Sequence, residues 1–481
     1  MVRRSFFNCD LTCAVNDDKI YIFYDKNRLF VHIYMLYNMV VRILSTRRCF
    51  MTNKVSIGKD IYKTSRILYI IEAALEYFVS LLVAGSYLAK LTTSIGLSDA
   101  VTGILSSLVS LGFGFQLLAV LFIGNKKVKS RVSILHTVNQ LMFASVYLVP
   151  LIDVPQGFKT ALFMVLLVGG HAINNIVNSP KINWFMSLVD DDKRGRFTAN
   201  KEIISLLGGM CFSFAMGSVI DYFEAQGKEN EAFIVCGLTL LALAILHTCT
   251  LIFSKEKPID EKAASISNKQ IFSELLKDKK YLRVVLLTTI WGVAHYATVP
   301  FYGTYTIKEL GFSMTFIAVL SAVSSISRAL FSRPLGKLGD KRTFAKMLLL
   351  AYGIKCLSFA VNTFTVPENG VFFYAAYSIL SAITFAGINS GEMNLVFESV
   401  SHEKRVCALA LKNTIAGLAG FCTTLVVSRL VEHIQNSGNT FLGMHVYAQQ
   451  VVSFIGALLV AVVLAYLYFG IIKRSQKEQV A

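Results

Sequence analysis

The feature that most constrains this chain is an internal repeat. Residues 178–209 align without a gap to residues 389–420, and 11 of the 32 aligned positions are identical. The offset of 211 residues means that a unit of about 200 residues occurs twice, which is the pattern of a duplicated fold. In a hydrophobic chain, repeats of this size are typical of membrane transporters, in which the substrate lies between the two copies.

The composition indicates a protein that crosses the membrane many times. Hydrophobic residues make up 54% of the chain and charged residues 16%, with a mean hydropathy of +0.56, whereas soluble domains carry about 25% charged residues. The net charge of +17 is concentrated in alternate loops between apolar stretches. This is the positive-inside pattern of membrane proteins, so we expect a lipid bilayer and no nucleic acid as partner. The nine cysteines lack metal-binding spacing, and we expect no metal and no cofactor.

Apolar stretches of about 20 residues, the length that crosses a bilayer, predict the fold. The expected architecture is an all-α membrane protein with 12 transmembrane helices in two pseudo-symmetric six-helix bundles. The basic loops predict that both ends of this unit are cytosolic, and we expect the plasma membrane as its location. The predicted spans are 66–91, 98–123, 132–152, 159–180, 200–222, 232–254, 283–306, 312–333, 343–365, 371–396, 406–430 and 445–472.

The domain boundaries follow from these spans. Residues 61–254 are expected to form the first bundle, 255–282 a cytosolic linker, and 283–481 the second bundle with a short cytosolic tail. Residues 1–60 lie outside the repeat as an N-terminal extension. Because Met51 begins a polar lead-in to the first span, we hypothesise that translation starts there; the alternative is that this extension holds an interfacial amphipathic helix. The mass of the natively expressed protein would decide.

The segment 333–342, Arg-Pro-Leu-Gly-Lys-Leu-Gly-Asp-Lys-Arg, resembles the loop signature of the major facilitator superfamily. The resemblance covers about residues 60–475 and implies two halves that rock around a central site, in a monomer. It implies that Gly336, Asp340 and Arg342 belong to a gating loop that locks the outward-facing state. Arg194 and its repeat partner Arg405 resemble the basic entry to the family's fifth helix, where they either gate or anchor the helix by snorkelling.

Two carboxyl groups in the first span are candidates for proton binding. Glu72 and Glu76 are one helical turn apart, and hence on one face. Charge at bilayer depth costs about 2.5–3.5 kcal/mol on insertion scales, so each calls for a function or a partner. We expect Glu76 to bind a coupling proton, with Glu72 beside it. The alternative is a structural pair with a base such as Lys355, which could instead bind an anionic solute.

Polar and aromatic residues on the fourth and seventh spans are candidates for solute binding. His171, Asn174 and Asn175 share one face of the fourth span, with packing by interhelical hydrogen bonds as the alternative. His295 and Tyr296 precede Pro300, a residue that can kink the seventh span at a gate. Tyr302 and Tyr305 follow it and favour an interfacial aromatic belt.

The sequence therefore predicts a secondary active transporter rather than an enzyme, because no phosphate-binding loop or catalytic motif occurs in it. We expect a small-molecule solute and a proton, or another coupling ion, to be carried together by alternating access. The alternatives are efflux of drugs or metabolites by proton antiport, and a membrane sensor or scaffold that transports nothing.

Overall fold

The structure is a computed structural model that describes residues 13–16, 19–22, 60–122, 127–190, 194–257, 268–401, 404–474 and 476. The chain divides into two compact units, Met1–Lys59 and Asp60–Ala481. In the first unit, β1 (Cys13–Asn16) pairs antiparallel with β2 (Lys19–Ile22). The hypotheses about Met51 and about an interfacial helix fall outside the described residues, and they stay predictions.

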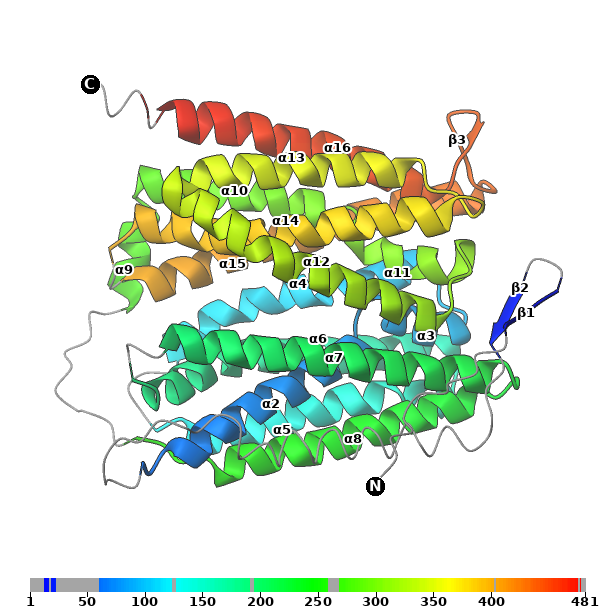
Figure 1. The fold of residues 1–481 in the computed structure, drawn as a ribbon, viewed down its shortest axis with the longest axis horizontal. Coiled ribbons are helices and arrows are strands. Elements are labelled where there is room, and N and C mark those ends of the chain that lie inside the picture. The colour runs from blue at the N-terminus through cyan, green and yellow to red at the C-terminus, as the bar shows by residue number, and fades with distance from the viewer. Residues whose placement is uncertain are drawn as a thin grey trace, which may run out of the picture. The chain divides into compact units, whose positions relative to one another are not determined.

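The second unit is built from long helices in two halves (Figure 1). The first half comprises α2 (Lys63–Leu82), α3 (Gly85–Ser94), α4 (Asp99–Phe122), α5 (Lys129–Val146), η1 (Val149–Leu151), α6 (Gln156–Ser187), α7 (Arg194–Glu224) and α8 (Glu229–Phe253). The second half comprises α10 (Lys279–Tyr296), η3 (Val299–Phe301), α11 (Tyr302–Thr304), η4 (Tyr305–Glu309), α12 (Met314–Lys341), α13 (Phe344–Thr363), α14 (Gly370–Ser399), α15 (Arg405–Asn436), α16 (Ala448–Tyr466) and η6 (Leu467–Ile472). The helices α7 and α15 begin at the offset of 211 that relates the repeated sequences.

Ten of the described helices are long and apolar enough to cross a membrane, or eleven if α2 and α3, which are bent by 43°, form one span. A helix lies at every predicted position. The number that are long and apolar enough to cross a membrane does not, however, confirm the predicted count of twelve spans. The helix that falls short is α5, which buries His136, Asn139 and Gln140. Polar side chains buried inside the bundle lower the apolarity of a helix that is otherwise placed like its neighbours.

The two ends of the helical unit differ. One end, here the linker end, carries α9 (Asn268–Leu275) and the turn between α14 and α15. There Glu274 of α9 pairs with Lys404 at 2.7 Å, and the Lys404 ammonium holds the pKa of this exposed carboxyl below its usual value by donating to it. The opposite end, here the hairpin end, carries the antiparallel pair β3 (Thr440–Phe441) and β4 (Met444–His445) (Figure 1).

Hydrogen bonds close the halves together at the hairpin end. Asp99 at the start of α4 accepts from Lys308 at 2.6 Å and from Gln435 at 2.8 Å, both of the second half. Asp221 near the end of α7 accepts the backbone N–H groups of Met314 at 2.8 Å and Thr315 at 2.7 Å. A carboxylate at a helix N-terminus satisfies free N–H groups and the helix dipole, so Asp221 fixes α12 against α7.

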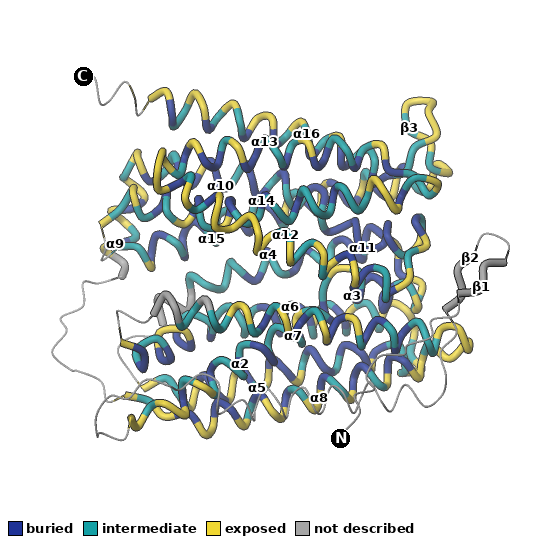
Figure 2. The backbone as a smooth tube through the Cα atoms, viewed as in Figure 1, coloured by how far each residue is buried: buried dark blue, intermediate teal, exposed yellow. Residues whose placement is uncertain are grey.

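At the linker end, α12 stands apart from the first half. Its residues 328–334 are all exposed (Figure 2), and Leu335 and Gly339, which follow them, are buried against α14 and α13 of the same half. The contacts that continue toward this end are those of α4 with α15, where Asn413 donates to Gln116 at 3.1 Å and Thr414 donates to the Phe113 carbonyl at 3.0 Å. The halves are thus joined at the hairpin end and along α4–α15.

The segment that resembles the superfamily's loop signature is helical rather than a loop. The helix α12 continues through Lys341, beyond the predicted end of the span at 333, and only Arg342 and Thr343 separate it from α13. A side chain on Gly336 would meet open space, whereas one on Gly339 would run into Phe344. Gly339 rather than Gly336 therefore permits the close approach of the two helices. Asp340 and Arg342 are exposed, and their role in gating stays a prediction.

The break after α10 follows its sequence. Pro300 cannot donate a backbone hydrogen bond, and it lies in η3 between α10 and α11, as the predicted kink requires. The interpretation of Tyr302 and Tyr305 as an interfacial belt is wrong, because both are buried in the protein. Tyr302 shares a hydrogen bond with Ser453 at 2.7 Å, and Tyr305 donates to the Thr365 carbonyl at 2.6 Å.

Candidate functional site

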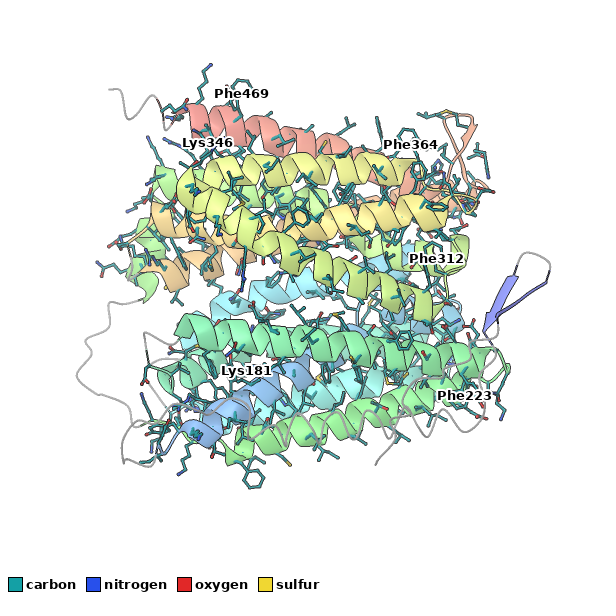
Figure 3. The ribbon with its side chains drawn as sticks, in the orientation of Figure 1. Lys181, Phe223, Phe312, Lys346, Phe364 and Phe469 are labelled. Carbon is teal, nitrogen blue, oxygen red and sulfur yellow. The ribbon has the colours of Figure 1, made fainter. Side chains whose placement is uncertain are left out.

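A cluster of five ionisable side chains is buried inside the first half. It is called the first-half cluster here. Four helices supply it: α2 carries Glu72 and Glu76, α5 carries His136, α6 carries Lys181, and α8 carries His247. Figure 3 labels Lys181 among the helices of this half. Glu72, His136, Lys181 and His247 are almost completely shielded from solvent, whereas the Glu76 side chain is 23% exposed. Glu76 is therefore the member through which the cluster reaches its surroundings.

Lys181 is the centre of the cluster. Its ammonium donates to Glu72 Oε1 at 2.8 Å and also to Glu76 Oε2. The same nitrogen lies 2.9 Å from His136 Nε2. The expected placement of Glu72 and Glu76 on one face is confirmed, since both reach one ammonium. Glu76 does pair with a base, as the alternative expects, but that base is Lys181. Lys355, the suggested partner, is wrong, because it lies in the second half and contacts neither carboxylate.

The two histidines complete the cluster, each beside one of the carboxylates. His247 Nε2 lies 2.9 Å from Glu72 Oε1, and His136 Nε2 lies 3.5 Å from Glu76 Oε1. The two rings are 4.6 Å apart between centroids. Both Nδ1 atoms and Glu72 Oε2 are buried without a hydrogen-bond partner among the described residues. Such atoms are costly to bury, and they leave room for a further proton or a changed arrangement.

The charges in the first-half cluster do not balance. Two carboxylates face a single obligate cation, and no other Lys or Arg of the described chain pairs with either of them. An uncompensated buried charge is strongly disfavoured in a low-dielectric interior. One added proton, on a histidine or on a carboxylate, makes the cluster neutral. The arrangement is therefore suited to binding one proton.

A metal ion fits this cluster poorly, although its donors could be read as a metal site. Ligand atoms of Glu72, His136 and His247 lie within 4.8 Å of one another, and two histidines with one carboxylate suit zinc. The Lys181 ammonium, however, lies within hydrogen-bond distance of Glu72 and His136. A fixed positive charge at this distance repels a second cation, so Lys181 already fills the role that a metal would have.

The second half holds a different polar cluster, in which Glu392 occupies the position that is equivalent to Lys181 in the repeat. Glu392 of α14 accepts from Lys412 of α15 at 2.8 Å and from the Tyr352 hydroxyl of α13 at 2.8 Å. All three side chains are largely buried. One carboxylate faces one ammonium, so this cluster is neutral without an added proton.

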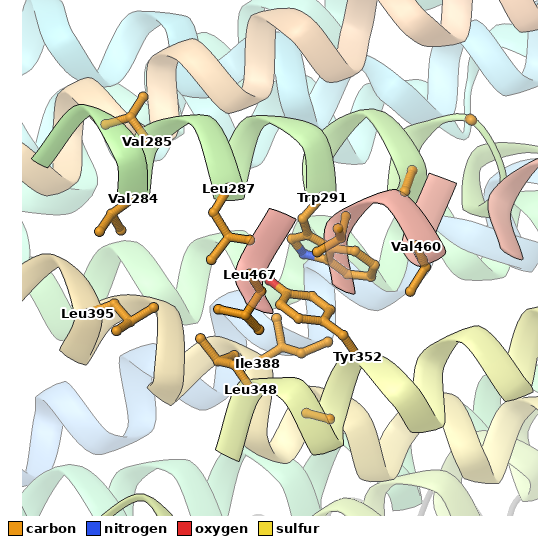
Figure 4. Close-up of a cluster of buried hydrophobic side chains, with 14 of the residues drawn as sticks. Val284, Val285, Leu287, Trp291, Leu348, Tyr352, Ile388, Leu395, Val460 and Leu467 are labelled. Atoms are coloured by element: carbon orange, nitrogen blue, oxygen red, sulfur yellow. The ribbon is translucent and has the colours of Figure 1, made fainter. Parts of the chain in front are cut away.

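Lys355 of α13 is a second buried cation in this half, in other surroundings. It is fully buried and donates to the Ser381 hydroxyl at 2.6 Å. Its ammonium lies over four aromatic rings, at 4.3 Å from the Phe359 centroid, 5.1 Å from Phe385, 5.4 Å from Tyr377 and 6.0 Å from Trp291. Figure 4 shows Trp291 beside Tyr352 in the hydrophobic core of this half. No carboxylate of the described residues pairs with Lys355.

The remaining predicted solute-binding residues lie on α6 and α10. His171 is buried, and its ring lies edge-on to that of Phe143 of α5 with 5.1 Å between the ring centroids. Asn175 donates to the His171 carbonyl at 2.9 Å. The side-chain oxygen of Asn174 is buried without a partner among the described residues. In α10, His295 and Tyr296 lie edge-on to each other at 5.0 Å. The structure does not bring the α6 and α10 residues into direct contact.

The two predicted gating arginines begin their helices as expected. Arg405 is the first residue of α15, and its guanidinium lies 4.7 Å from the Phe397 ring centroid. Arg194 is the first residue of α7, and its side chain lies outside the described part of the chain. Whether either residue gates transport stays a prediction.

Lys181, His136 and His247 were missed by the sequence analysis. The fourth span was predicted to end at 180, which placed Lys181 just outside it, whereas α6 continues to Ser187. A signal was present, because Lys181 lies seven residues after Asn174 and so shares its face of the helix. The histidines are isolated in the sequence, and only the fold places them beside the carboxylates.

Helices in two repeated halves, with ionisable groups buried between helices, define a membrane transport protein of the two-bundle type. The sequence profile of the Major Facilitator Superfamily matches residues 70–424. The chain belongs to this superfamily, and it is accordingly a secondary transporter rather than an enzyme. A comparison with curated protein sequences finds no match.

Solved structures share the fold at low sequence identity. The nucleoside transporter NupG superposes with a TM-score of 0.61 at 17% identity, covering 84% of this chain and 97% of that one. A D-xylose-proton symporter gives a TM-score of 0.63 at 12% identity, covering 83% and 97%. A bacterial homologue of the human lysosomal transporter Spinster gives 0.59 at 13% identity, covering 85% and 97%. These likenesses show the fold of the chain.

Proposed function

We propose that the protein carries a small solute across the membrane together with a proton, by alternating access. The observation that carries this proposal is the charge of the first-half cluster, in which two carboxylates share one ammonium. Proton coupling requires a group that is occupied at one stage of the cycle and empty at another. A buried cluster that lacks one positive charge provides such a group.

Glu76 is the proposed point of proton entry. Its side chain is partly exposed while the rest of the cluster is enclosed, so a proton that enters the cluster meets Glu76 first. When Glu76 is protonated, its hold on the Lys181 ammonium weakens, and Lys181 binds Glu72 more closely. Such an exchange of partners between α2 and α6 is a discrete local switch, of the kind that biases a larger two-state motion.

The contacts between the halves support access from the linker end. Asp99 and Asp221 tie the halves together at the hairpin end, whereas residues 328–334 of α12, toward the linker end, are all exposed. We place the linker end in the cytosol, because basic residues gather there, including Lys337, Lys341 and Arg342. The plasma membrane, a monomer, and a domain division at residues 255–282 remain part of this proposal.

The proposed solute pathway runs between α6 and α10. It includes His171, Asn174 and Asn175 on the first half and His295 and Tyr296 on the second. Tyr296 packs against Gly420 of α15, and α15 in turn contacts α4 of the first half. A solute held between the halves here is released when they rock apart.

The test is solute uptake into proteoliposomes under an imposed pH gradient. A panel of labelled sugars, nucleosides, amino acids, monocarboxylates and cationic dyes is offered to the wild type, to Glu76→Gln and to Glu231→Gln. Glu231 is a matched control, because it is a half-exposed glutamate paired with Lys228 at the hairpin end. We expect accumulation driven by the gradient in the wild type and in Glu231→Gln.

In Glu76→Gln we expect solute exchange without a gradient to continue while gradient-driven accumulation is lost. Accumulation that survives this substitution would contradict the role of Glu76. Solute movement opposite to the proton would favour antiport and efflux. A folded protein that moves no member of the panel would favour the sensor or scaffold.

A further inference from the structure

Lys355 of the second half is a buried lysine whose surroundings, among the described residues, supply no counter-ion. It is fully buried, and among the described residues no carboxylate pairs with it. An ammonium has three hydrogen-bond donors, of which one goes to Ser381. The aromatic rings around the other two give cation–π contacts, which are weaker than a charged hydrogen bond. An anion bound at this position would accept charged hydrogen bonds from these two remaining donors.

An aromatic wall connects Lys355 with the proposed solute pathway. Trp291 and Phe385 each contact Lys355 on one side and His295 on the other, with His295 ring centroids 5.4 Å from Trp291 and 5.6 Å from Phe385. His295 is partly exposed, and its Nδ1 is buried without a partner among the described residues. Beside it, Tyr296 faces α15. A shared site of His295 and Lys355 therefore requires the rings of Trp291 and Phe385, which contact both, to turn aside.

We propose that His295 and Lys355 bind the carboxylate of a small organic anion, which is the solute of this transporter. The inference rests on the proposed transport function and names its class of solute. Lys355 supplies the charge, His295 and Ser381 supply further hydrogen bonds, and the rings of Trp291 and Phe385 cover the apolar part of the anion. Binding sites of this kind are mostly apolar, with a few polar groups that fix orientation.

The charges of the two halves make this assignment coherent. The first-half cluster lacks one positive charge, and the Lys355 site lacks one negative charge. One proton and one monovalent anion together neutralise both halves. The loaded carrier then buries no net charge in either place, so its change between the two access states is favoured over that of a carrier loaded with only one of the two.

The test uses the fluorescence of Trp291, which lies 6.0 Å from the Lys355 ammonium. Trp184 and Trp291 are the two tryptophans of the chain, so Trp184→Phe leaves Trp291 as the reporter in the purified full-length protein. Lactate, succinate, inorganic phosphate, xylose and uridine are titrated in turn. We expect a saturable change with lactate and none with xylose or uridine.

Three variants on the same background locate the site. Lys355→Met should weaken lactate binding by at least about tenfold, as expected for loss of a charged hydrogen bond. Lys355→Arg, which keeps the charge, should retain part of it. Lys346→Met is the matched control, because Lys346 is an exposed lysine on the same helix, and it should bind lactate as the parent does.

Each outcome separates this inference from the proposed function. Saturable binding of xylose or uridine but not of lactate, with proton-driven uptake intact, would overturn the anion site and leave proton-coupled transport standing. Lactate binding that Lys355→Met leaves unchanged would also overturn it. Binding of phosphate but not of lactate would overturn the carboxylate assignment. Lactate binding that depends on Lys355 supports the site even where no proton-driven uptake is found.

Discussion

The repeated helices of the two halves, α6 and α7 in the first and α14 and α15 in the second, carry different charged residues at equivalent positions. At one pair of equivalent positions the first half has Lys181 where the second has Glu392, and at another both have lysine, Lys201 and Lys412. In the second half, Glu392 and Lys412 form a self-sufficient pair. In the first half the equivalent residues, Lys181 and Lys201, are both cations and cannot pair with each other. Lys181 pairs instead with the carboxylates of α2, and the Lys201 ammonium lies 5.5 Å from the Tyr69 ring centroid.

The difference shows that two halves with the same fold can bury different sets of charged residues. The first half gathers two carboxylates and two histidines around one lysine and is left with an excess of negative charge. The second half balances its glutamate internally and leaves Lys355 without a carboxylate. The fold is shared, while the polar residues inside each half are separately adapted, as expected where function resides in sites rather than in folds.

The largest effect is expected from removing the cation that holds the first-half cluster together. Lys181→Met strands two buried carboxylates, and breaking a buried ion pair in this way costs about 3–5 kcal/mol of stability. Thermal unfolding in detergent measures it. Lys201→Met is the control, since its lost cation–π contact is worth about 0.5–1 kcal/mol. Equal, small losses in the two variants would contradict the central role of Lys181.

A smaller loss is expected in the second half from Lys412→Met. It strands one carboxylate rather than two, and Tyr352 still donates to that carboxylate, so we expect a loss of about 2 kcal/mol. Adding Glu392→Gln to it should restore most of the stability, because a neutral amide needs no counter-ion. A double variant as unstable as Lys412→Met alone would mean that the pair is not self-contained.

A gain in stability is expected from Lys355→Met in the absence of solute. Methionine has a similar length and suits an aromatic environment, and the variant removes a buried charge that lacks a carboxylate partner. We expect a gain of about 1 kcal/mol in the free energy of unfolding, within the range seen when buried charges are replaced by apolar groups. Thermal unfolding alongside Lys346→Met measures it. A large loss would indicate that Lys355 is a structural cation.

The smallest effect on stability is expected from Glu76→Gln. The substitution removes the excess carboxylate while Lys181 keeps Glu72, so the free energy of unfolding should change by less than about 1 kcal/mol. Glu72→Gln should cost more, because it removes the partner shared by Lys181 and His247. The reverse order, measured by thermal unfolding, would contradict the assignment of Glu76 as the dispensable charge.

The sequence predicts the helices and the repeat well, because apolar length and basic loops are local signals. It also predicts that Glu72 and Glu76 share a face, since helical spacing decides this. It cannot pair Glu76 with Lys181 rather than Lys355, because those side chains meet across α2 and α6 only after packing. The predicted span boundary at 180 left Lys181 outside the fourth span. The continuation of α12 through Lys341 differs from the prediction because the segment 333–342 resembles a loop signature.

The two halves carry opposite charges without a counter-ion, and proton uptake on anion binding tests whether these charges are coupled. Lactate is added to lightly buffered, purified protein carrying Trp184→Phe, while a pH dye and Trp291 fluorescence are followed together at a series of pH values. Binding of one ligand that favours another is reciprocal. We expect proton uptake with lactate binding in the parent, and lactate binding without proton uptake in Glu76→Gln. Proton uptake that Glu76→Gln leaves unchanged, or lactate binding without proton uptake in the parent at every pH, would contradict this coupling.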